Sequence, residues 1–196
     1  FEKMAIEVKG LEVPMHDPRA FRSNALNYAV ANRGACHMDG LSFPVEAGVP
    51  ALDLGYTAPM DFFANEGKAE LTYKMHNLMC LYDALGFCKF YILSQMGPKL
   101  MSQYSNAATG WDTTMEELME TGDRIYTLKR LFNVERGTTR KDDYLPARLL
   151  NTPQRSDVPP VGGENLNKLI YEYYQIRGWD ENGRPTEEKL ASLGLA

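Results

Sequence analysis

Residues 66–86 read EGKAELTYKMHNLMCLYDALG, and this stretch decides the fold. Its apolar residues Leu71, Met75, Leu78 and Tyr82 recur at the i, i+4, i+7, i+11 spacing that predicts one buried face of an α-helix. No window of the chain alternates apolar and polar residues as a half-buried strand does. The sequence therefore predicts an all-α fold, a multi-helical orthogonal bundle with long connecting loops.

Capping signals and apolar periodicity place the other helices. Asp17 followed by Pro18 is a favourable helix start, and Thr113 with Glu116 three residues later forms a capping box. The first of these predicted helices runs over 17–34 and would bring residues 33–37 to its C-terminal end. Two longer helices are predicted over 113–137 and 164–177, and short ones over 99–104 and 186–193.

The segments between these helices differ in character. Residues 40–59 and 151–163 are rich in Gly and Pro or in polar residues, so we expect irregular connections there. The run from Phe87 to Met96 is strongly apolar, which predicts burial on every side. A connection as long as 40–59 is often functional.

Composition narrows the class of protein. The chain has 196 residues and a net charge of −5, with Lys and Arg scattered singly, which argues against a nucleic acid or membrane partner. No apolar run is long enough to span a bilayer, and Phe1 to Met4 lacks a signal-peptide start. Three cysteines cannot all pair, and their scatter through helical sequence favours a reducing compartment. We expect a cytoplasmic protein, and its opening residues, FEKMAIEVKG, read like the middle of a longer chain.

The chemically most informative run is Asp83-Ala84-Leu85-Gly86-Phe87-Cys88. Gly86 can adopt a positive φ after the helix, which would let Asp83 and Cys88 approach one ligand from the same side. The residues alone permit this geometry without demanding it. The plainer interpretation is a carboxylate near a helix end followed by a buried structural cysteine.

The pattern Asp-x-x-Gly-x-Cys resembles the pterin- and cluster-binding motif of the aldehyde:ferredoxin oxidoreductase family, which usually has Leu at the position of Phe87. The resemblance extends over nearly the whole chain and keeps the family's order. It is carried by EVKGLEVPMHDPRAF at 7–21, NYAVANRGACHMDG at 27–40, GDRIYTLKRLFNVERG at 122–137 and NKLIYEYYQIRGWDENGRPTEEKLASLGL at 167–195. It implies that 1–196 is the family's C-terminal all-helical domain.

The resemblance also implies roles for Asp83, Cys88 and His37. Asp83 would accept hydrogen bonds from a pterin, and Cys88 would be one thiolate of a [4Fe–4S] cluster whose other three cysteines lie upstream. His37 would exchange a proton at the active site, although it could instead cap a helix end. The chemistry of Arg33 adds a further candidate, because its planar guanidinium suits either a cofactor phosphate or a carboxylate partner.

The remaining histidines and cysteines have simpler interpretations. His16 and His76 are expected to be structural or solvated, and Cys36 and Cys80 to be small buried residues. A zinc site built from Cys36, His37, Cys80 and Cys88 is disfavoured, because the chain has no Cys pair at zinc-ligand spacing.

The implied enzyme oxidises a small aldehyde to a carboxylic acid at a tungsten- or molybdenum-bis-pterin centre. It passes electrons through the [4Fe–4S] cluster to ferredoxin, and the N-terminal domains of the same polypeptide complete both cofactor sites. Two alternatives stay open at this point. One is a reductase that uses the same metal centre on another substrate, and the other is a non-catalytic helical scaffold or interaction module descended from the family.

Overall fold

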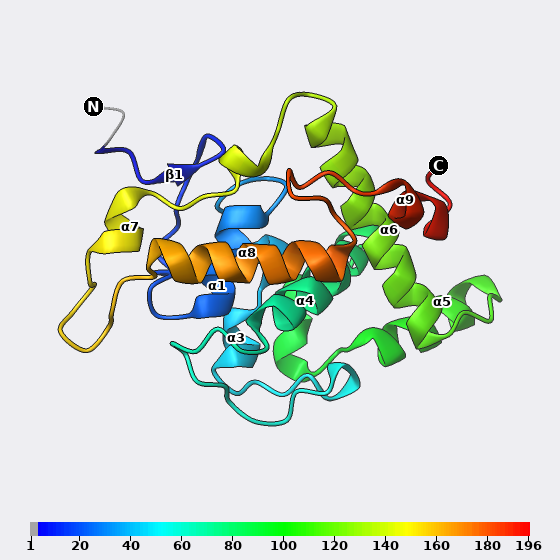
Figure 1. Ribbon diagram of the computed structural model, residues 1–196. Helices are drawn as coiled ribbons and strands as arrows, with labels where there is room; N and C mark the ends of the chain where they lie inside the picture. Colours follow the sequence, from blue (N-terminus) through cyan, green and yellow to red (C-terminus); the bar gives the residue numbers. More distant parts are fainter. Residues whose placement is uncertain (1–3) are drawn as a thin grey trace.

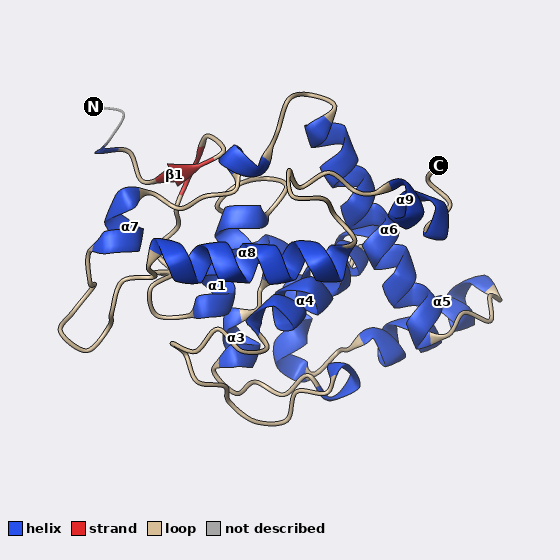
Figure 2. Cartoon of the chain, viewed as in Figure 1, coloured by secondary structure: helices blue, strands red, loops and turns tan. Residues whose placement is uncertain are grey.

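The computed structural model describes residues 4–196 and confirms the predicted helical fold (Figures 1 and 2). Phe1 to Lys3 lie outside the described residues, so the prediction that Phe1 to Met4 lack a signal-peptide start falls mostly outside them. The helices are α1 Arg22–Val30, α2 His37–Gly40, α3 Phe43–Glu46, η2 Leu52–Leu54, α4 Lys68–Ala84, η3 Lys89–Ser94, α5 Pro98–Thr109, α6 Met115–Val134, η4 Arg140–Asp142, α7 Ala147–Asn151, α8 Gly163–Arg177 and α9 Glu187–Ser192. Among the described residues, no helix is long and apolar enough to cross a membrane.

Helix α4 is the central element of the fold and packs against α1, α2, α6 and α8 (Figure 1). It separates two apolar cores. One core joins α4 to α1 and α8 through residues such as Leu26 and Ile170, and the other joins it to η3 and α5 through residues such as Met75 and Met101. Each fully buried Leu, Ile or Met side chain stabilises the fold by about 1.5–3 kcal/mol. The prediction of a single buried face was therefore incomplete, because α4 is buried on both sides.

The second face of α4 is buried although it carries polar residues, and hydrogen bonds explain why. His76 is fully buried between the side chains of Asn27 and Tyr173, at 2.8 and 2.7 Å from its two ring nitrogens. Lys68 is also fully buried and lies 2.5 Å from the Glu46 carboxylate. Buried polar groups are tolerated when they are paired in this way. The structural interpretation of His76 is confirmed.

Helix α6 crosses α4 at a glycine. A Cβ atom on Gly122 would lie 2.4 Å from the backbone oxygen of Asn77, so only glycine allows this close approach. The helix begins one residue later than predicted, with Thr114 as N-cap and Glu117 completing the capping box. The sequence TTMEE at 113–117 offers two equivalent Thr-x-x-Glu pairs, and the second is the one used.

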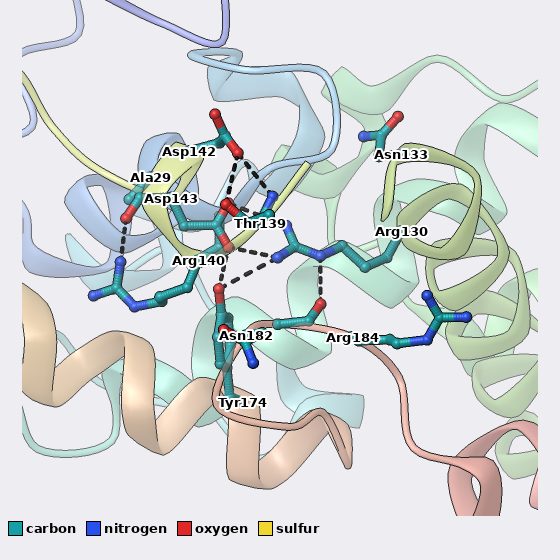
Figure 3. A network of polar contacts seen from close by, with 12 residues as sticks. Ala29, Arg130, Asn133, Thr139, Arg140, Asp142, Asp143, Tyr174, Asn182 and Arg184 are labelled. Carbon is teal, nitrogen blue, oxygen red and sulfur yellow. Dashed lines mark hydrogen bonds and ion pairs between the residues drawn. The ribbon is translucent and has the colours of Figure 1, made fainter. Parts of the chain in front are cut away.

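A buried ionic network fastens the C-terminal half of α6 to α8 (Figure 3). Arg130 of α6 lies 2.8 Å from the Asp143 carboxylate, and Tyr174 of α8 donates its hydroxyl to the same carboxylate. Burial alone would raise the pKa of Asp143, but Lys9 and Arg130 outweigh it and hold the pKa below its usual value. Arg130 also donates to the backbone oxygen of Gly183 at 2.7 Å, which connects the turn before α9 to the network.

Helices α8 and α9 match their predicted positions, but the prediction for the first helix was wrong at both ends. Asp17 does not cap a helix, because its carboxylate is taken by the side chain and backbone N–H of Arg19. Helix α1 therefore begins at Arg22 and ends at Val30, ahead of residues 33–37. The segment 40–59, predicted to be irregular, contains α3 and η2.

A short hairpin near the start of the chain was also not predicted from the sequence. Glu7–Val8 and Leu11–Glu12 pair as an antiparallel hairpin, β1 and β2, around Lys9 and Gly10, which both have positive φ. Strands of two residues are too short to show alternation. Helix α7 was not predicted either, and it leads into the irregular segment 151–163 that the sequence did predict.

Candidate functional site

Helix α4 ends in a Schellman motif that exposes the side chains of the candidate run. The N–H of Phe87 donates to the Tyr82 carbonyl at 2.9 Å, and Gly86, with a φ of +73°, donates to the Asp83 carbonyl at 3.3 Å. The expected positive φ of Gly86 is confirmed. Asp83 and Cys88 are both exposed on the two sides of this turn, so the interpretation of Cys88 as a buried structural cysteine is wrong.

A groove of about 570 Å³ opens beside this turn and brings Asp83 and Arg33 to one place. The turn after α1, helix α2, the end of α4 and the C-terminal half of α6 form its walls. Its lining residues are Asn32, Arg33, Met38, Asp39, Asp83, Lys89, Leu128, Lys129, Phe132 and Asn133. Two of the four predicted site residues therefore share one groove although they lie far apart in the sequence.

The groove mixes cationic, anionic and apolar groups. Lys89 is held between the Asp83 carboxylate, at 2.9 Å, and the Met38 backbone oxygen, at 3.0 Å. Burial raises the pKa of Asp39, and the positive charges of Lys129 and Lys89 oppose that rise. The Asn32 side-chain oxygen is buried without a hydrogen-bond partner in the described structure. Such a lining suits a ligand that has both hydrogen-bond donors and acidic groups.

His37 is placed differently from the prediction. It is the first residue of the short helix α2 and not the end of a long helix, so an interaction with a helix C-terminus does not arise. It is also not among the residues that line the groove. Its half-buried ring lies against His16, with centroids 4.4 Å apart, and burial followed by the His16 charge lowers its pKa. His37 is thus a neutral imidazole near neutral pH, able to accept a proton.

A buried chain of hydrogen bonds fixes the backbone just before His37. Asn27 donates to the Cys36 carbonyl at 3.1 Å, which turns its side-chain oxygen toward His76. His76 therefore carries its proton on Nε2, and its Nδ1 accepts from the Tyr173 hydroxyl. Arg177 in turn donates to the Tyr173 hydroxyl at 2.8 Å. Helices α1, α4 and α8 together hold the α2 start in place.

The three cysteines do not gather into a metal site. Cys36 and Cys80 are buried as predicted, whereas Cys88 is exposed at the start of η3. Within residues 4–196, no cluster of three or more His, Cys, Asp or Glu side chains could hold a metal ion. Within these residues, the structure therefore gives no support to a zinc site built from Cys36, His37, Cys80 and Cys88.

Most of the residues that line the groove were not predicted from the sequence. Lys89 directly follows Cys88 and could have been suspected on that ground alone. Leu128 and Phe132 are spaced i, i+4 on α6 and read as part of its buried face, yet their exposed fractions are 52% and 55%. Asp39 and Lys129 carry no sequence signal, because only the packing of α2 against α4 and of α6 against α4 brings them to Asp83.

Comparison with protein families finds a match over residues 1–195, to the family described as aldehyde ferredoxin oxidoreductase, domains 2 and 3. A tungsten-containing aldehyde ferredoxin oxidoreductase from Pyrococcus furiosus is 34% identical over 196 residues, which cover 99% of this chain and 31% of that protein. The enzyme of the same description from Pyrococcus abyssi is 36% identical, with 96% of this chain and 30% of that protein covered. The chain thus spans about a third of the length of these relatives.

Two further similarities concern enzymes with other names. An aliphatic sulfonate oxidoreductase, WOR-like subunit, from Pyrococcus furiosus is 28% identical over 98% of this chain and 28% of its own length. Among solved structures, the active site complex BamBC of benzoyl coenzyme A reductase with 1,5-dienoyl-CoA has a TM-score of 0.56 and 25% identity. That similarity covers 69% of this chain and 20% of the other.

Proposed function

The chain belongs to the aldehyde ferredoxin oxidoreductase family, and on this premise we propose that it helps to hold the cofactors of an enzyme that oxidises aldehydes to carboxylic acids. The observation that carries the proposal is that Asp83 and Arg33 line one groove. The exposed thiol of Cys88 lies on the same turn as Asp83. The names of the relatives imply a tungsten-pterin cofactor.

The groove residues fit a pterin. Asp83 presents an acceptor-only carboxylate for ring and amino N–H groups, and the unpartnered Asn32 oxygen offers a second acceptor. Arg33 is exposed and forms no ion pair in the described structure, so its guanidinium can take a phosphate. When bound, a tungsten- or molybdenum-bis-pterin would supply the two-electron redox chemistry, and a [4Fe–4S] cluster would pass the electrons on singly.

Cys88 would bind that cluster as one of four thiolates. It is exposed and its neighbour Lys89 holds Asp83, so the thiol and the carboxylate lie on one rigid helix end. This shared turn would fix the distance between the two redox centres. The other three thiolates would come from residues outside this chain, because Cys36 and Cys80 are buried elsewhere.

His37 would handle a proton of the reaction. Conversion of an aldehyde and water to a carboxylic acid releases two protons and two electrons, so a neutral base near the substrate is useful. The lowered pKa of His37 leaves it unprotonated at neutral pH, and the hydrogen bonds behind Cys36 restrict its movement. The electrons would leave the enzyme on ferredoxin, in the cytoplasm.

A second candidate function is an oxidoreductase that acts on a substrate other than an aldehyde. It is favoured by the similarity to an aliphatic sulfonate oxidoreductase subunit and to a benzoyl coenzyme A reductase complex. Pocket residues from the remainder of the polypeptide would decide the substrate, since this chain spans only about a third of its relatives.

The test is an activity assay on the natural full-length protein, purified anaerobically. We expect reduction of ferredoxin that depends on added aldehyde, and much weaker reduction after His37→Ala. Control reactions without aldehyde show the background. A protein that contains the metal yet reduces no ferredoxin with a panel of aliphatic and aromatic aldehydes would point to the second candidate.

A further inference from the structure

The surface formed by η3 and the start of α5 exposes an unusual number of large apolar side chains. The sequence predicted burial on every side for the run 87–96, but Phe90 is 62% exposed and Leu93 is 54% exposed. Only Ile92 and Met96 of this run are buried. We call this the η3–α5 surface, and its residues are Phe87, Phe90, Tyr91, Leu93, Leu100 and Tyr104. Clustered apolar exposure of this kind marks interaction sites.

The η3–α5 surface is hollowed. A groove of about 320 Å³ lies between η3 and α5 and is lined by Phe87, Tyr91, Ser94, Met96, Leu100 and Tyr104. The rings of Phe87 and Tyr104 are 6.5 Å apart at their centroids and form part of this apolar lining. The hollow can take an apolar side chain from an incoming segment.

The exposure is not a consequence of loose attachment. Tyr82 of α4 donates its hydroxyl to the Met96 backbone oxygen at 2.5 Å, and Ile92 is 1% exposed in the core beneath. The Asp53 carboxylate accepts from the backbone N–H of Lys99 at 3.2 Å and so caps α5. Both elements are therefore fixed on the core, with Phe90 and Leu93 directed outward.

The η3–α5 surface adjoins the candidate site through Cys88. Phe87, immediately before Cys88, lines the apolar groove, and Lys89, immediately after it, lines the groove that contains Asp83 and Arg33. A segment that approaches the exposed Cys88 thiol closely would therefore also cover Phe87 and its neighbours.

We propose that the η3–α5 surface is the docking face for another segment of the same polypeptide, one that lies outside this chain and presents apolar side chains to the groove. The relatives are about three times as long as this chain, so about two thirds of their residues lie outside the matched part and are available to cover this surface. Interfaces within one chain bury about 600–1,500 Å². The proposal rests on the proposed function, which also requires outside residues to reach Cys88.

The test is carbene or hydroxyl-radical footprinting of the natural full-length protein with intact cofactors. The labelling rate at Phe90, Tyr91 and Leu93 is divided by the rate at the same residue in the urea-unfolded protein. Docking predicts ratios below about one fifth, since labelling follows the exposed area. Tyr171 on α8, 67% exposed and outside both grooves, is the matched aromatic for comparison.

Two outcomes would overturn the proposal. Ratios near the exposed fractions of 51–62% would mean that the surface stays open in the complete protein. Protection that disappears on dilution would assign the surface to a second copy of the protein. Metal and iron contents measured on the same sample separate these results from a failure of the proposed function, because an enzyme can hold its cofactors while this surface remains exposed.

Discussion

Lys89 donates from its ammonium group to the Asp83 carboxylate at 2.9 Å, across the turn that ends α4. The Asp83 side chain is 54% exposed, so this pair contributes at most about 1 kcal/mol to stability. The carboxylate thus keeps acceptor capacity for a ligand, and Lys89 fixes its direction. If Asp83 binds the pterin, its replacement should affect cofactor retention far more than folding.

The first prediction concerns Asp83. In the full-length protein, Asp83→Asn should lower the content of tungsten or molybdenum, because hydrogen bonds to a charged group are worth about 1.5–3 kcal/mol, roughly ten-fold or more in affinity. Plasma mass spectrometry measures the metal per chain after dialysis. Asp157→Asn, at an exposed loop position, is the control that should retain the metal. Equal retention in both variants would contradict the role of Asp83.

The second prediction concerns the buried pair of Lys68 and Glu46, whose side chains are 1% and 0% exposed. Lys68→Met should destabilise the chain by about 3–5 kcal/mol, because it leaves a buried carboxylate without its partner. The matched control is Lys168→Met at the exposed pair with Glu164, where little or no loss of stability is expected. Urea unfolding measures the free energy of unfolding of both variants. A loss in Lys68→Met as small as that in Lys168→Met would show that Glu46 finds another partner.

The third prediction concerns the crossing of α4 and α6. Gly122→Ala should destabilise the fold by about 1–3 kcal/mol, since the new methyl group would meet the Asn77 carbonyl. That loss outweighs the gain of about 1 kcal/mol in helix propensity. Gly163→Ala, with no atom within 4 Å of its Cβ position, should be neutral or slightly stabilising. Thermal unfolding distinguishes the two, and a stabilised Gly122→Ala variant would contradict the close approach.

The fourth prediction is a loss of stability in mild acid. Burial, with help from Arg177, lowers the pKa of His76 well below its usual value, so the folded protein keeps this ring neutral. The unfolded chain protonates it near pH ~6.5. Below that pH the unfolded state binds more protons, and the free energy of unfolding should fall by up to ~1.4 kcal/mol per pH unit until the folded-state pKa is reached.

Urea unfolding between about pH 7 and about pH 5 measures this slope. His76→Gln removes one titrating group and should flatten the dependence of the unfolding free energy on pH. Part of the dependence should remain, because the pKa of His37 is also lowered. An unchanged slope in His76→Gln would mean that another group causes the loss.

Local signals in the sequence predicted the parts of the fold that depend on local interactions. Helix α8 follows from an apolar period, α9 lies within the predicted range 186–193, and the end of α4 follows from Gly86. The predicted start of α1 was wrong because the Asp17 side chain pairs with Arg19, and this interaction competes with helix capping. Neighbouring Thr-x-x-Glu pairs made the start of α6 ambiguous by one residue.

The candidate site was predictable only in part, for a physical reason. Asp83 and Cys88 lie on one turn, so their shared location follows from the local sequence. Arg33 and Asp83 line one groove only because α1 and α2 pack on α4, and no short sequence pattern encodes that packing. The exposure of Phe90 and Leu93 was missed because an apolar run has the same pattern whether it is covered within the chain or by another segment.

The measurement that most directly tests the central claim is the iron content of the anaerobically purified full-length protein, with and without Cys88→Ser. We expect about four iron atoms per chain in the unaltered protein and a marked loss in the variant, because one of the cluster thiolates is removed. Cys80→Ala removes a buried thiol and should keep its iron. Full iron content in Cys88→Ser, or no iron in the unaltered protein, would contradict the cofactor-holding role of this chain.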